Sequence, residues 1–582
     1  MPVSHTAIAR RRKTSDAASQ ITQQSTVSDS AKQTDAVLLE DKYYLDNFNY
    51  LVDFVQQHYS HLFTDEEHQF CHAYSRLTVN AQKLFVRLAL RTHAYFRLSK
   101  INYAELNIPQ ALKELGRCGF INRDSDGIEH CLHLFTHTEL GQALGRGFSN
   151  TAEIDLAVWT SSDLFGDSPI ARLMADESII EVNFKELVIT FRLLFFGNLH
   201  QDFSSFVLRD LGYRHYENYT IDSTTLLFKS RKQLEAHLQY YICADRFDDA
   251  CLHGRDALRE LSQSLPAKIL TDKTLCRRVD RLNNRIARQL EREQELNAAA
   301  HIYANTIHPP ARERLARIKE KQGNTDESLK LCRQILTAPR DSDELDFASA
   351  FGQRLAKKLS VDFPTTVAYK PPETTLKLEK SNLPVEFAVA LHLAKSGKCY
   401  YLENNLLSGI FGLAFWDIIF ANVNGAFFHP FQSHPADFYE PEFLLARESM
   451  IANRLAEVNR GNLCHYVNTY SYHKRAIRNP VVNWVMCRKH IVDLALIKIP
   501  AAHWHAVFCQ MLSDVRNYRS GQPDLVYFPD ADTEADAETN KYQLLEVKAP
   551  GDKLQKNQLR WMKCFNEHNI PHGVVHVEWL DD

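Results

Sequence analysis

The order of secondary-structure elements at the C-terminal end constrains the fold of this chain more than any other feature of its sequence. Short apolar runs predict strands at 524–528 and 541–548. An amphipathic helix is expected at 553–569, followed by a last strand at 573–579. Strand, strand, helix and strand in this order indicate an α/β domain whose first two strands are antiparallel neighbours.

Two acidic residues and a lysine lie on the first two of these strands. Asp524 begins one strand, directly after a Gly-Gln-Pro turn. Glu546 and Lys548 are two residues apart on the other, so their side chains share a face while the Val547 side chain points into the core. Strand pairing should bring Asp524 beside Glu546. Two carboxylates and the Val547 carbonyl would form an oxygen-rich site suited to Mg²⁺ or Mn²⁺.

Each half of this pattern has a structural alternative. A Pro-Asp sequence is a common turn, and Glu-x-Lys on a strand is more often a solvated edge or a cross-strand ion pair. Both halves together, followed by the helix and the last strand, favour a catalytic site. There Lys548 would orient or deprotonate a metal-bound water that attacks phosphorus. We therefore predict Asp524, Glu546 and Lys548 as catalytic residues.

Length and composition limit the class of protein. A chain of 582 residues is too long for one core and predicts several domains. Its formal net charge of -4 argues against a protein that coats nucleic acid, yet a local basic stripe can still bind phosphates. The 12 cysteines form no CxxC pair. No apolar segment resembles a signal peptide or a membrane span. Together these features predict reduced thiols in a cytosolic setting.

The chain is expected to be a mainly α multidomain protein with a C-terminal α/β domain. Residues 1–37 lack aromatic residues and predict a disordered tail. Residues 38–230 form a helical N-terminal region, and residues 231–384 a helical-hairpin region resembling tetratricopeptide repeats with an extended, Pro-containing linker. The catalytic domain is expected at 385–582.

The N-terminal region has two possible structures. A helix at 81–91 carries a stripe of Lys83, Arg87 and Arg91, and a shorter helix at 108–115 precedes a small hydrophobic strand at 119–122. A helix followed by a strand in this way is typical of winged-helix modules. A helical packing domain with surface lysines and arginines is equally compatible with the pattern.

Short motifs extend the C-terminal pattern into a resemblance. These motifs are Gly521-x-Pro-Asp-Leu, Glu546-Val-Lys-x-Pro, Asp552-x-Leu and Gln558-x-x-Trp561. With them, residues 516–579 resemble a VRR-NUC domain of the PD-(D/E)xK superfamily. From about residue 40 to the end, the chain resembles the Fanconi-associated nuclease family, which implies a SAP-like DNA-binding N-terminal region. The absence of zinc-finger cysteines suggests a bacterial member.

The resemblance implies a further metal ligand. The family carries a metal-binding Glu before a Trp-Asp-Ile-Ile-Phe stretch, and Glu403 stands thirteen residues before Trp416 here. Without the family, Glu403 would be interpreted as an acidic residue that satisfies a helix dipole. Glu448 is a competing acidic residue, for which we expect a structural role. The predicted metal ligands are thus Glu403, Asp524, Glu546 and the Val547 carbonyl.

Two more residues are assigned by the resemblance. Arg516 matches a family arginine in a pocket for the 5′-phosphate of the cut strand, and a guanidinium group suits forked contacts with phosphate. Its structural alternative is an exposed arginine at a helix end. Gln558 is expected to support the active site.

The expected function is that of a Mg²⁺- or Mn²⁺-dependent DNA nuclease. The family implies 5′-flap endonuclease and 5′-to-3′ exonuclease activity on branched or nicked duplex DNA in interstrand crosslink repair. The expected location is the cytoplasm at the bacterial nucleoid, or the nucleus in a eukaryote, with no membrane and no identified protein partner. The alternatives are a Holliday-junction or restriction-type nuclease on the same fold, and a non-catalytic DNA-binding scaffold.

Overall fold

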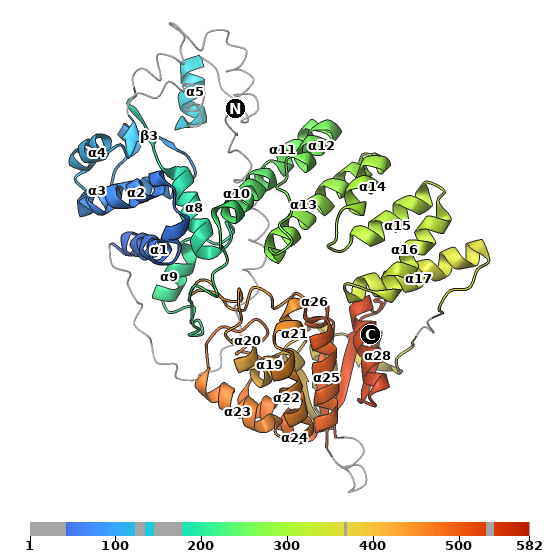
Figure 1. The fold of residues 1–582 in the computed structure, drawn as a ribbon. Coiled ribbons are helices and arrows are strands. Elements are labelled where there is room, and N and C mark those ends of the chain that lie inside the picture. The colour runs from blue at the N-terminus through green and yellow to red at the C-terminus, as the bar shows by residue number, and fades with distance from the viewer. Residues whose placement is uncertain (1–41, 123–133, 145–176, 366–368, 531–540, 581–582) are drawn as a thin grey trace. The chain divides into compact units, whose positions relative to one another are not determined.

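The computed structural model describes residues 42–122, 134–144, 177–365, 369–530 and 541–580 (Figure 1). The predicted tail, residues 1–37, lies outside them. The chain divides into two compact units, one of Met1–Tyr213 with Leu227–Leu252, the other of Arg214–Leu226 with His253–Asp582. Each unit is described by itself.

The first unit combines helices with a small antiparallel sheet. Its strands are β1 (Tyr95–Arg97), β2 (Ile121–Asn122) and β3 (Ile179–Val182), in the order β1-β3-β2. Phenylalanine rings of α2, α8 and the α4–β2 turn meet in its core. Strand β2, which follows α4 directly, agrees with the winged-helix interpretation. The helices are α1 (Tyr43–Tyr59), α2 (Asp65–Ser75), α3 (Val79–Ala89), α4 (Ile108–Arg117), α5 (His137–Leu144), α8 (Lys185–Phe196), α9 (Ser204–Asp210), α10 (Arg231–Asp245) and α11 (Phe247–His253).

Two members of the predicted basic stripe on α3 and its end make contacts within this unit. The Arg87 guanidinium lies 4.2 Å from the Tyr44 ring centroid and 4.5 Å from that of Tyr103, and it pairs with Glu105 at 2.5 Å. Arg91 donates a hydrogen bond to the Tyr103 hydroxyl at 2.9 Å. Part of the stripe is therefore used to hold the loop after β1 against α3.

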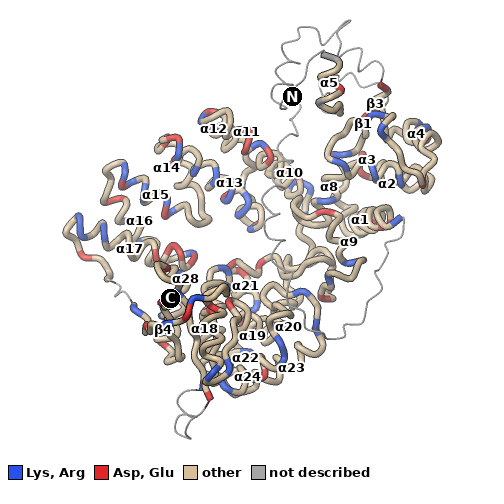
Figure 2. The backbone as a smooth tube through the Cα atoms, turned by 180° about the vertical axis from the view of Figure 1, so that it is seen from behind, with Lys and Arg blue, Asp and Glu red and all other residues tan. Residues whose placement is uncertain are grey.

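Paired helices form the first part of the second unit. Each helix from α13 to α17 packs on the next, and Gly323, with φ 85°, makes the turn between α15 and α16 that the sequence predicts. Lys and Arg are interspersed with Asp and Glu along these helices (Figure 2). The helices are α12 (Arg255–Gln263), α13 (Lys273–Arg292), α14 (Leu296–Ala304), α15 (Ala311–Lys321), α16 (Thr325–Thr337) and α17 (Ser342–Leu359).

A mixed five-stranded sheet forms the centre of the C-terminal part. The order is β4-β8-β7-β6-β5, with β4, β8 and β7 parallel and with β6 antiparallel to both β7 and β5. The predicted strand, strand, helix and strand are β6, β7, α28 and β8. The bounds are β4 (Glu373–Glu379), β5 (Gly397–Tyr401), β6 (Leu525–Pro529), β7 (Gln543–Lys548), α28 (Lys556–Glu567) and β8 (His572–Leu580).

The sheet begins before the predicted domain boundary at residue 385. The segment expected to be a linker contains β4, which pairs in parallel with β8 from Glu373 opposite Val574 to Glu379 opposite Leu580. This partner is distant in sequence, so the local pattern shows only an extended segment. The linker prediction therefore needs correction, because part of it is an edge strand of the C-terminal sheet.

Helices cover both faces of this sheet. On one face, α18 packs Val389 and Ala390 against residues of β6, β7 and β8. On the other, α19, α25 and α28 form the larger core around Trp416, Trp504 and Trp561. The helices are α18 (Val385–Leu393), α19 (Leu406–Ala414), α20 (Trp416–Ile419), α21 (Glu442–Ala446), α22 (Glu448–Asn459), α23 (Leu463–His473), α24 (Lys489–Lys498), α25 (Ala501–Ser513) and α26 (Val515–Tyr518).

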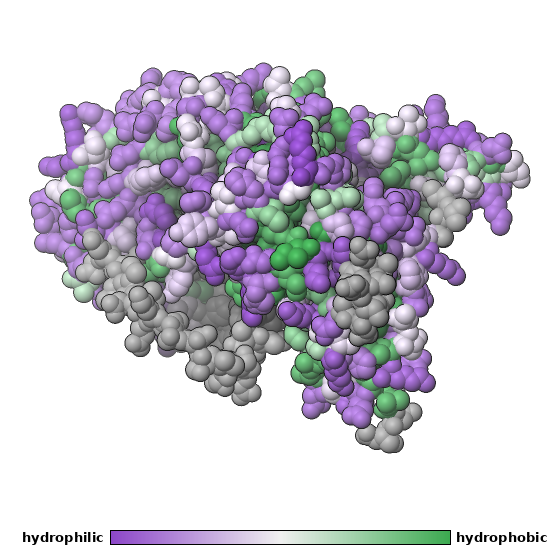
Figure 3. All heavy atoms as spheres, turned by 90° about the horizontal axis from the view of Figure 1, so that it is seen from below, coloured by the Kyte–Doolittle hydropathy of each residue, from purple (hydrophilic) through white to green (hydrophobic). Residues whose placement is uncertain are grey.

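The outer surface is mostly hydrophilic on the face shown in Figure 3, with apolar side chains in small groups. No single helix of the described residues has both the length and the apolar composition to cross a bilayer. Among these residues, one bent pair of helices, Lys489–Lys498 with Ala501–Ser513, satisfies the two criteria when its helices are taken together.

Candidate active site and the arginine cluster beside it

Asp524 is held at the point where three strands meet. It immediately precedes β6, and its Oδ2 accepts a hydrogen bond from the Val547 backbone N–H of β7 at 2.9 Å. Its carbonyl accepts from the Leu402 N–H, just after β5, at 2.9 Å. The pairing of β6 and β7 ends at Leu525 opposite Leu545. Beyond this point, the hydrogen bond from the Asp524 side chain replaces the backbone pairing between the two strands.

Glu546, Lys548 and Gln558 form a closed polar group. Lys548 Nζ donates to Glu546 Oε1 at 2.8 Å and to Gln558 Oε1 at 3.1 Å, while Gln558 Nε2 donates to Glu546 Oε1 at 2.5 Å. Glu546 is 1% exposed and Lys548 7%. The period-two geometry of β7 places the first two on one face, and α28 supplies Gln558 from above that face.

The carboxyl groups of Asp524, which is partly buried, and Glu546, which is buried, hold their protons more firmly than free ones do. Burial raises the pKa of Asp524 to about 6, although the Val547 N–H opposes the shift, and Glu386 and Glu403 raise it further. Burial and then the charge of Asp524 raise the pKa of Glu546 to about 8, against the lowering effect of Lys548. The ionised forms of both groups are therefore disfavoured in the absence of a cation, and such shifted carboxyl groups are common at functional sites.

Glu403 lies in the turn between β5 and α19, close enough for its charge to raise the pKa of both Asp524 and Glu546. Its carboxylate is turned toward its own neighbours: the Tyr401 hydroxyl donates to Oε2 at 2.8 Å and Asn404 Nδ2 to Oε1 at 3.1 Å. The residue is outside α19, which begins at Leu406, and not at the helix start where the sequence pattern placed it.

The donor atoms of this site fit a hard divalent cation. Glu546 Oε2 is buried and has no hydrogen-bond partner among the described residues, so one carboxylate oxygen is left for a ligand. The other acidic side chains also supply oxygen, as Mg²⁺ and Mn²⁺ prefer. Within the described part of the chain, no three His, Cys, Asp or Glu side chains are already gathered as a metal ligand set. Glu403 would have to turn away from Tyr401 to complete one.

Two other acidic residues differ in their relation to the site. Glu386, in the first turn of α18, raises the pKa of Asp524 and was missed, because a glutamate in the first turn of a helix is common and satisfies the helix dipole. Glu448 is exposed in the first turn of α22 and is not among the groups that shift the pKa of Asp524 or Glu546.

Arg516 is engaged in an ion pair. It lies on α26, half exposed, and its Nη2 donates to Glu440 Oε1 at 2.6 Å and to the Tyr439 carbonyl at 3.2 Å. Two arginines of α13 approach the same oxygen: Arg281 Nη2 at 3.0 Å and Arg277 Nε at 3.7 Å. The sequence gives no signal for this cluster, because its members come from helices and loops far apart in the chain.

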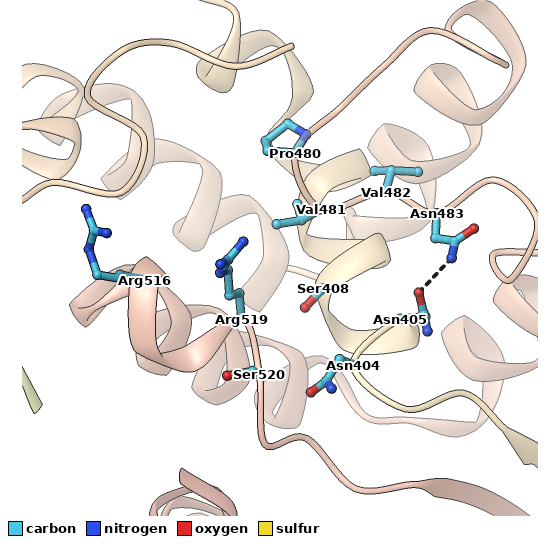
Figure 4. Close-up of a pocket in the computed structure, with 10 residues that line it drawn as sticks. All are labelled: Asn404, Asn405, Ser408, Pro480, Val481, Val482, Asn483, Arg516, Arg519 and Ser520. Atoms are coloured by element: carbon cyan, nitrogen blue, oxygen red, sulfur yellow. Dashed lines mark hydrogen bonds between the residues drawn. The ribbon is translucent and has the colours of Figure 1, made fainter. Parts of the chain in front are cut away.

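A pocket of about 340 Å³ lies between Arg516 and Arg519 and the start of α19 (Figure 4). Asn404, the neighbour of Glu403, lies on one side of it, and Arg516 and Arg519 lie on another. On the side of the pocket away from the arginines, Asn483 Nδ2 donates a hydrogen bond to Asn405 Oδ1 at 3.0 Å. The pocket is lined by Asn404, Asn405, Ser408, Pro480, Val481, Val482, Asn483, Arg516, Arg519 and Ser520.

Comparisons with known proteins identify the family. Residues 465–579 match the family model described as the VRR-NUC domain, and residues 42–122 match the one described as the FAN1 HTH domain. The second match agrees with the winged-helix interpretation, since a winged helix is a helix-turn-helix variant.

Whole-chain relatives agree with these matches. The Fanconi-associated nuclease 1 homolog of Pseudomonas aeruginosa is 32% identical over 94% of this chain and 97% of its own length. The homolog of Arabidopsis thaliana is 26% identical over 89% of this chain and 64% of its own length. A solved structure described as paFAN1 bound to 2-nucleotide 5′-flap DNA with a gap has a TM-score of 0.83 and 31% identity, and covers 94% of this chain and 100% of that one. This chain therefore belongs to the Fanconi-associated nuclease family, and it is a DNA nuclease of the VRR-NUC type.

Proposed function

We propose that this chain cuts 5′-flap DNA as a divalent-metal-dependent endonuclease, acts as a 5′-to-3′ exonuclease, and serves interstrand crosslink repair at the bacterial nucleoid. The observation that carries the proposal is the group of Asp524, Glu546 and Lys548 at the adjoining ends of β6 and β7. Relatives that cover nearly the whole chain support the substrate, because two solved structures of paFAN1 are described as bound to 5′-flap DNA.

Mg²⁺ or Mn²⁺ is the proposed cofactor. Glu403, Asp524, Glu546 and the Val547 carbonyl would hold it, with Glu546 Oε2 as the ligand that has no other partner. When bound there, the ion would supply Lewis-acid chemistry, which polarises a phosphate and activates a water as a nucleophile at neutral pH. The Val547 N–H fixes Asp524 in place through its hydrogen bond.

Lys548 is the proposed orienting group for the attacking water. Its ammonium group is fixed by Glu546 and Gln558 and nearly excluded from bulk solvent, so it can direct a donor toward one position with little loss of entropy. Its positive charge also favours the negative charge that develops on the phosphoryl oxygens. Gln558 supports the site because it bonds to both partners at once.

Arg516 and its neighbours are the proposed contact for a 5′-phosphate. Arg516 and Arg519 both line the pocket that reaches Asn404 beside Glu403, so a phosphate bound to them would lie along a continuous surface from the cutting site. Guanidinium groups bind phosphate oxygens through paired hydrogen bonds. This surface would let the nuclease measure its cut from a 5′ end.

The test compares 5′-flap, 3′-flap and four-way-junction DNA with Mg²⁺, Mn²⁺ or EDTA. We expect metal-dependent cleavage with a preference for the 5′ flap, and loss of at least about 10³-fold in rate for Asp524→Ala, as when a group central to catalysis is removed. A preference for the junction would favour the Holliday-junction alternative. Cleavage by Asp524→Ala at the wild-type rate would place the active site elsewhere.

A further inference from the structure

One carboxylate stands at the centre of the arginine cluster. Glu440 Oε1 is approached by Arg516 Nη2 at 2.6 Å, Arg281 Nη2 at 3.0 Å and Arg277 Nε at 3.7 Å. The Glu440 side chain is 10% exposed, whereas those of Arg281 and Arg516 are 45% and 42% exposed. Several guanidinium groups around a single anionic oxygen are the arrangement with which proteins bind phosphate.

The cluster keeps an excess of positive charge despite this carboxylate. Arg277 also lies 3.4 Å from Glu442, and Arg519 stacks on the Tyr439 ring at 4.8 Å. Four arginines and two glutamates give a net charge of +2 (4 − 2): Arg277, Arg281, Arg516, Arg519, Glu440 and Glu442. An excess of this kind in a partly buried place attracts a further anion.

His308 adds no positive charge to this cluster. Arg281 Nε donates to His308 Nε2 at 3.2 Å, so that ring nitrogen is unprotonated. Burial, and next the charges of Arg281, Arg516 and Arg277, lower the pKa of His308 to about 4 although Asp280 opposes the shift. Neutral His308 therefore orients the Arg281 guanidinium through an accepted hydrogen bond.

We propose that Glu440 is a specificity-determining residue whose carboxylate occupies the place of a phosphate among Arg277, Arg281 and Arg516 and competes with the 5′-terminal phosphate of DNA. The idea rests on the proposed function, which brings a 5′ end to Arg516. Glu440 thereby sets how strongly the nuclease distinguishes a 5′-phosphate from a 5′-hydroxyl end.

The exposures of the partners explain how the competition works. Arg281 and Arg516 are half exposed and can turn their guanidinium groups toward an incoming phosphate, while Glu440 stays nearly buried. The bound phosphate then lies near a fixed negative charge, which weakens its binding. Removal of that charge, with the side-chain shape kept, should strengthen binding of the phosphorylated end.

The experiment measures binding of DNA carrying a one-nucleotide 5′ flap, phosphorylated or hydroxyl-ended, by fluorescence anisotropy in EDTA. The readout is the ratio of the two dissociation constants, which cancels contacts with internal phosphates. Glu440→Gln should raise the preference for the phosphorylated end about fivefold, as expected for one unit charge a few ångströms away in a wet site. Glu442→Gln is the matched control: it removes the same charge beside Arg277, and it should leave the ratio within about a factor of two of wild type.

An unchanged ratio in Glu440→Gln would overturn the proposal, and a lowered ratio would also overturn it by showing that Glu440 positions the arginines. If Glu440→Gln does not fold, the same measurement is made on Arg281→Ala, which removes one of the exposed guanidinium groups. This variant should lower the preference for the phosphorylated end, and an unchanged preference would overturn the proposal. Metal-dependent flap cleavage by the wild type is assayed in parallel. Its absence refutes the proposed function, whereas cleavage with an unchanged ratio refutes only the role of Glu440.

Discussion

At the residue scale, Glu546 shows how a buried carboxyl group lowers the stability of the metal-free protein as pH rises. Its folded-state pKa of about 8 lies above its usual value of 4.5, so the folded chain keeps a proton that the unfolded chain releases between these pH values. Stability from this group is therefore full below about pH 4.5 and falls as pH rises toward 8. In EDTA, Glu546→Gln should show a higher melting temperature than wild type at pH 8 and a smaller loss between pH 5 and 8.

Circular dichroism melts at these pH values check the prediction. Glu448→Gln, exposed on α22, should follow the wild type and serves as the control. Added Mg²⁺ should stabilise the wild type more than Glu546→Gln, because the variant lacks the ionised carboxylate. Equal pH dependence of wild type and Glu546→Gln would contradict the raised pKa and the burial described for Glu546.

Gln558 gives a second prediction at this scale. It bonds to both Glu546 and Lys548, so Gln558→Ala should lower kcat about 10- to 100-fold, the usual effect of removing a residue that orients a metal site. Flap binding in EDTA should be unchanged. Glu567→Ala, at the exposed C-terminal end of the same helix, where Glu567 pairs only loosely with Lys563 at 3.8 Å, should keep near-wild-type kcat. If weaker binding of flap DNA accounts for the whole loss of activity in Gln558→Ala, the role of Gln558 in orienting the metal site is refuted.

At the element scale, Asp514 connects two helices of the second unit. Its Oδ2 accepts from the Ser342 N–H and hydroxyl at the start of α17, both at 2.9 Å, and its Oδ1 accepts from the Asn517 N–H of α26 at 3.2 Å. Because α26 carries Arg516, Asp514→Ala should lower stability by about 1–2 kcal/mol in urea unfolding. It should also lower the preference for a 5′-phosphorylated end.

Asp341→Ala is the matched control for Asp514. Asp341 is the N-cap of α17 alone, through the Glu344 N–H at 2.8 Å. Its replacement should cost similar stability without changing the preference for the phosphorylated end. If both variants change that preference equally, the connection between Asp514 and Arg516 is not what sets it.

The elements also show what the sequence could and could not predict. Local apolar runs and amphipathicity are sufficient to predict β6, β7, α28 and β8, because each pattern lies within one element. The same period places Glu546 and Lys548 on one face, and the antiparallel pairing of these consecutive strands makes β7 the neighbour of Asp524. These predictions need no information about distant contacts.

Other features depend on pairing across the chain. β4 pairs with β8, so its sequence alone shows an extended segment and not a sheet strand. Glu403 came only from the family resemblance, since nothing local links the β5–α19 turn to β7. The ion pairs of Glu440 join residues 159 and 76 positions apart, on Arg281 and Arg516, and no periodicity indicates such contacts.

For the whole molecule, net charge is a poor guide to DNA binding. The chain has 68 Lys and Arg against 72 Asp and Glu, yet the surface that leads from the acidic site carries Arg516 and Arg519. Binding through local phosphate contacts predicts that log Kd for flap DNA changes linearly with log salt concentration. Arg519→Gln should reduce that slope by about 1, one phosphate contact. Anisotropy titrations over several NaCl concentrations check this, and an unchanged slope would exclude Arg519 from phosphate contact.

The central claim is that the acidic residues at β5, β6 and β7 hold the divalent cation of this nuclease. A crystal structure with Mn²⁺, with anomalous scattering used to locate the metal, tests it most directly. We expect an anomalous peak within bonding distance of Glu546 Oε2, Asp524 and the Val547 carbonyl, with the Glu403 carboxylate turned from Tyr401 toward it. A peak bound elsewhere, or no peak at Glu546 in crystals whose protein cleaves DNA with Mn²⁺, would contradict the claim.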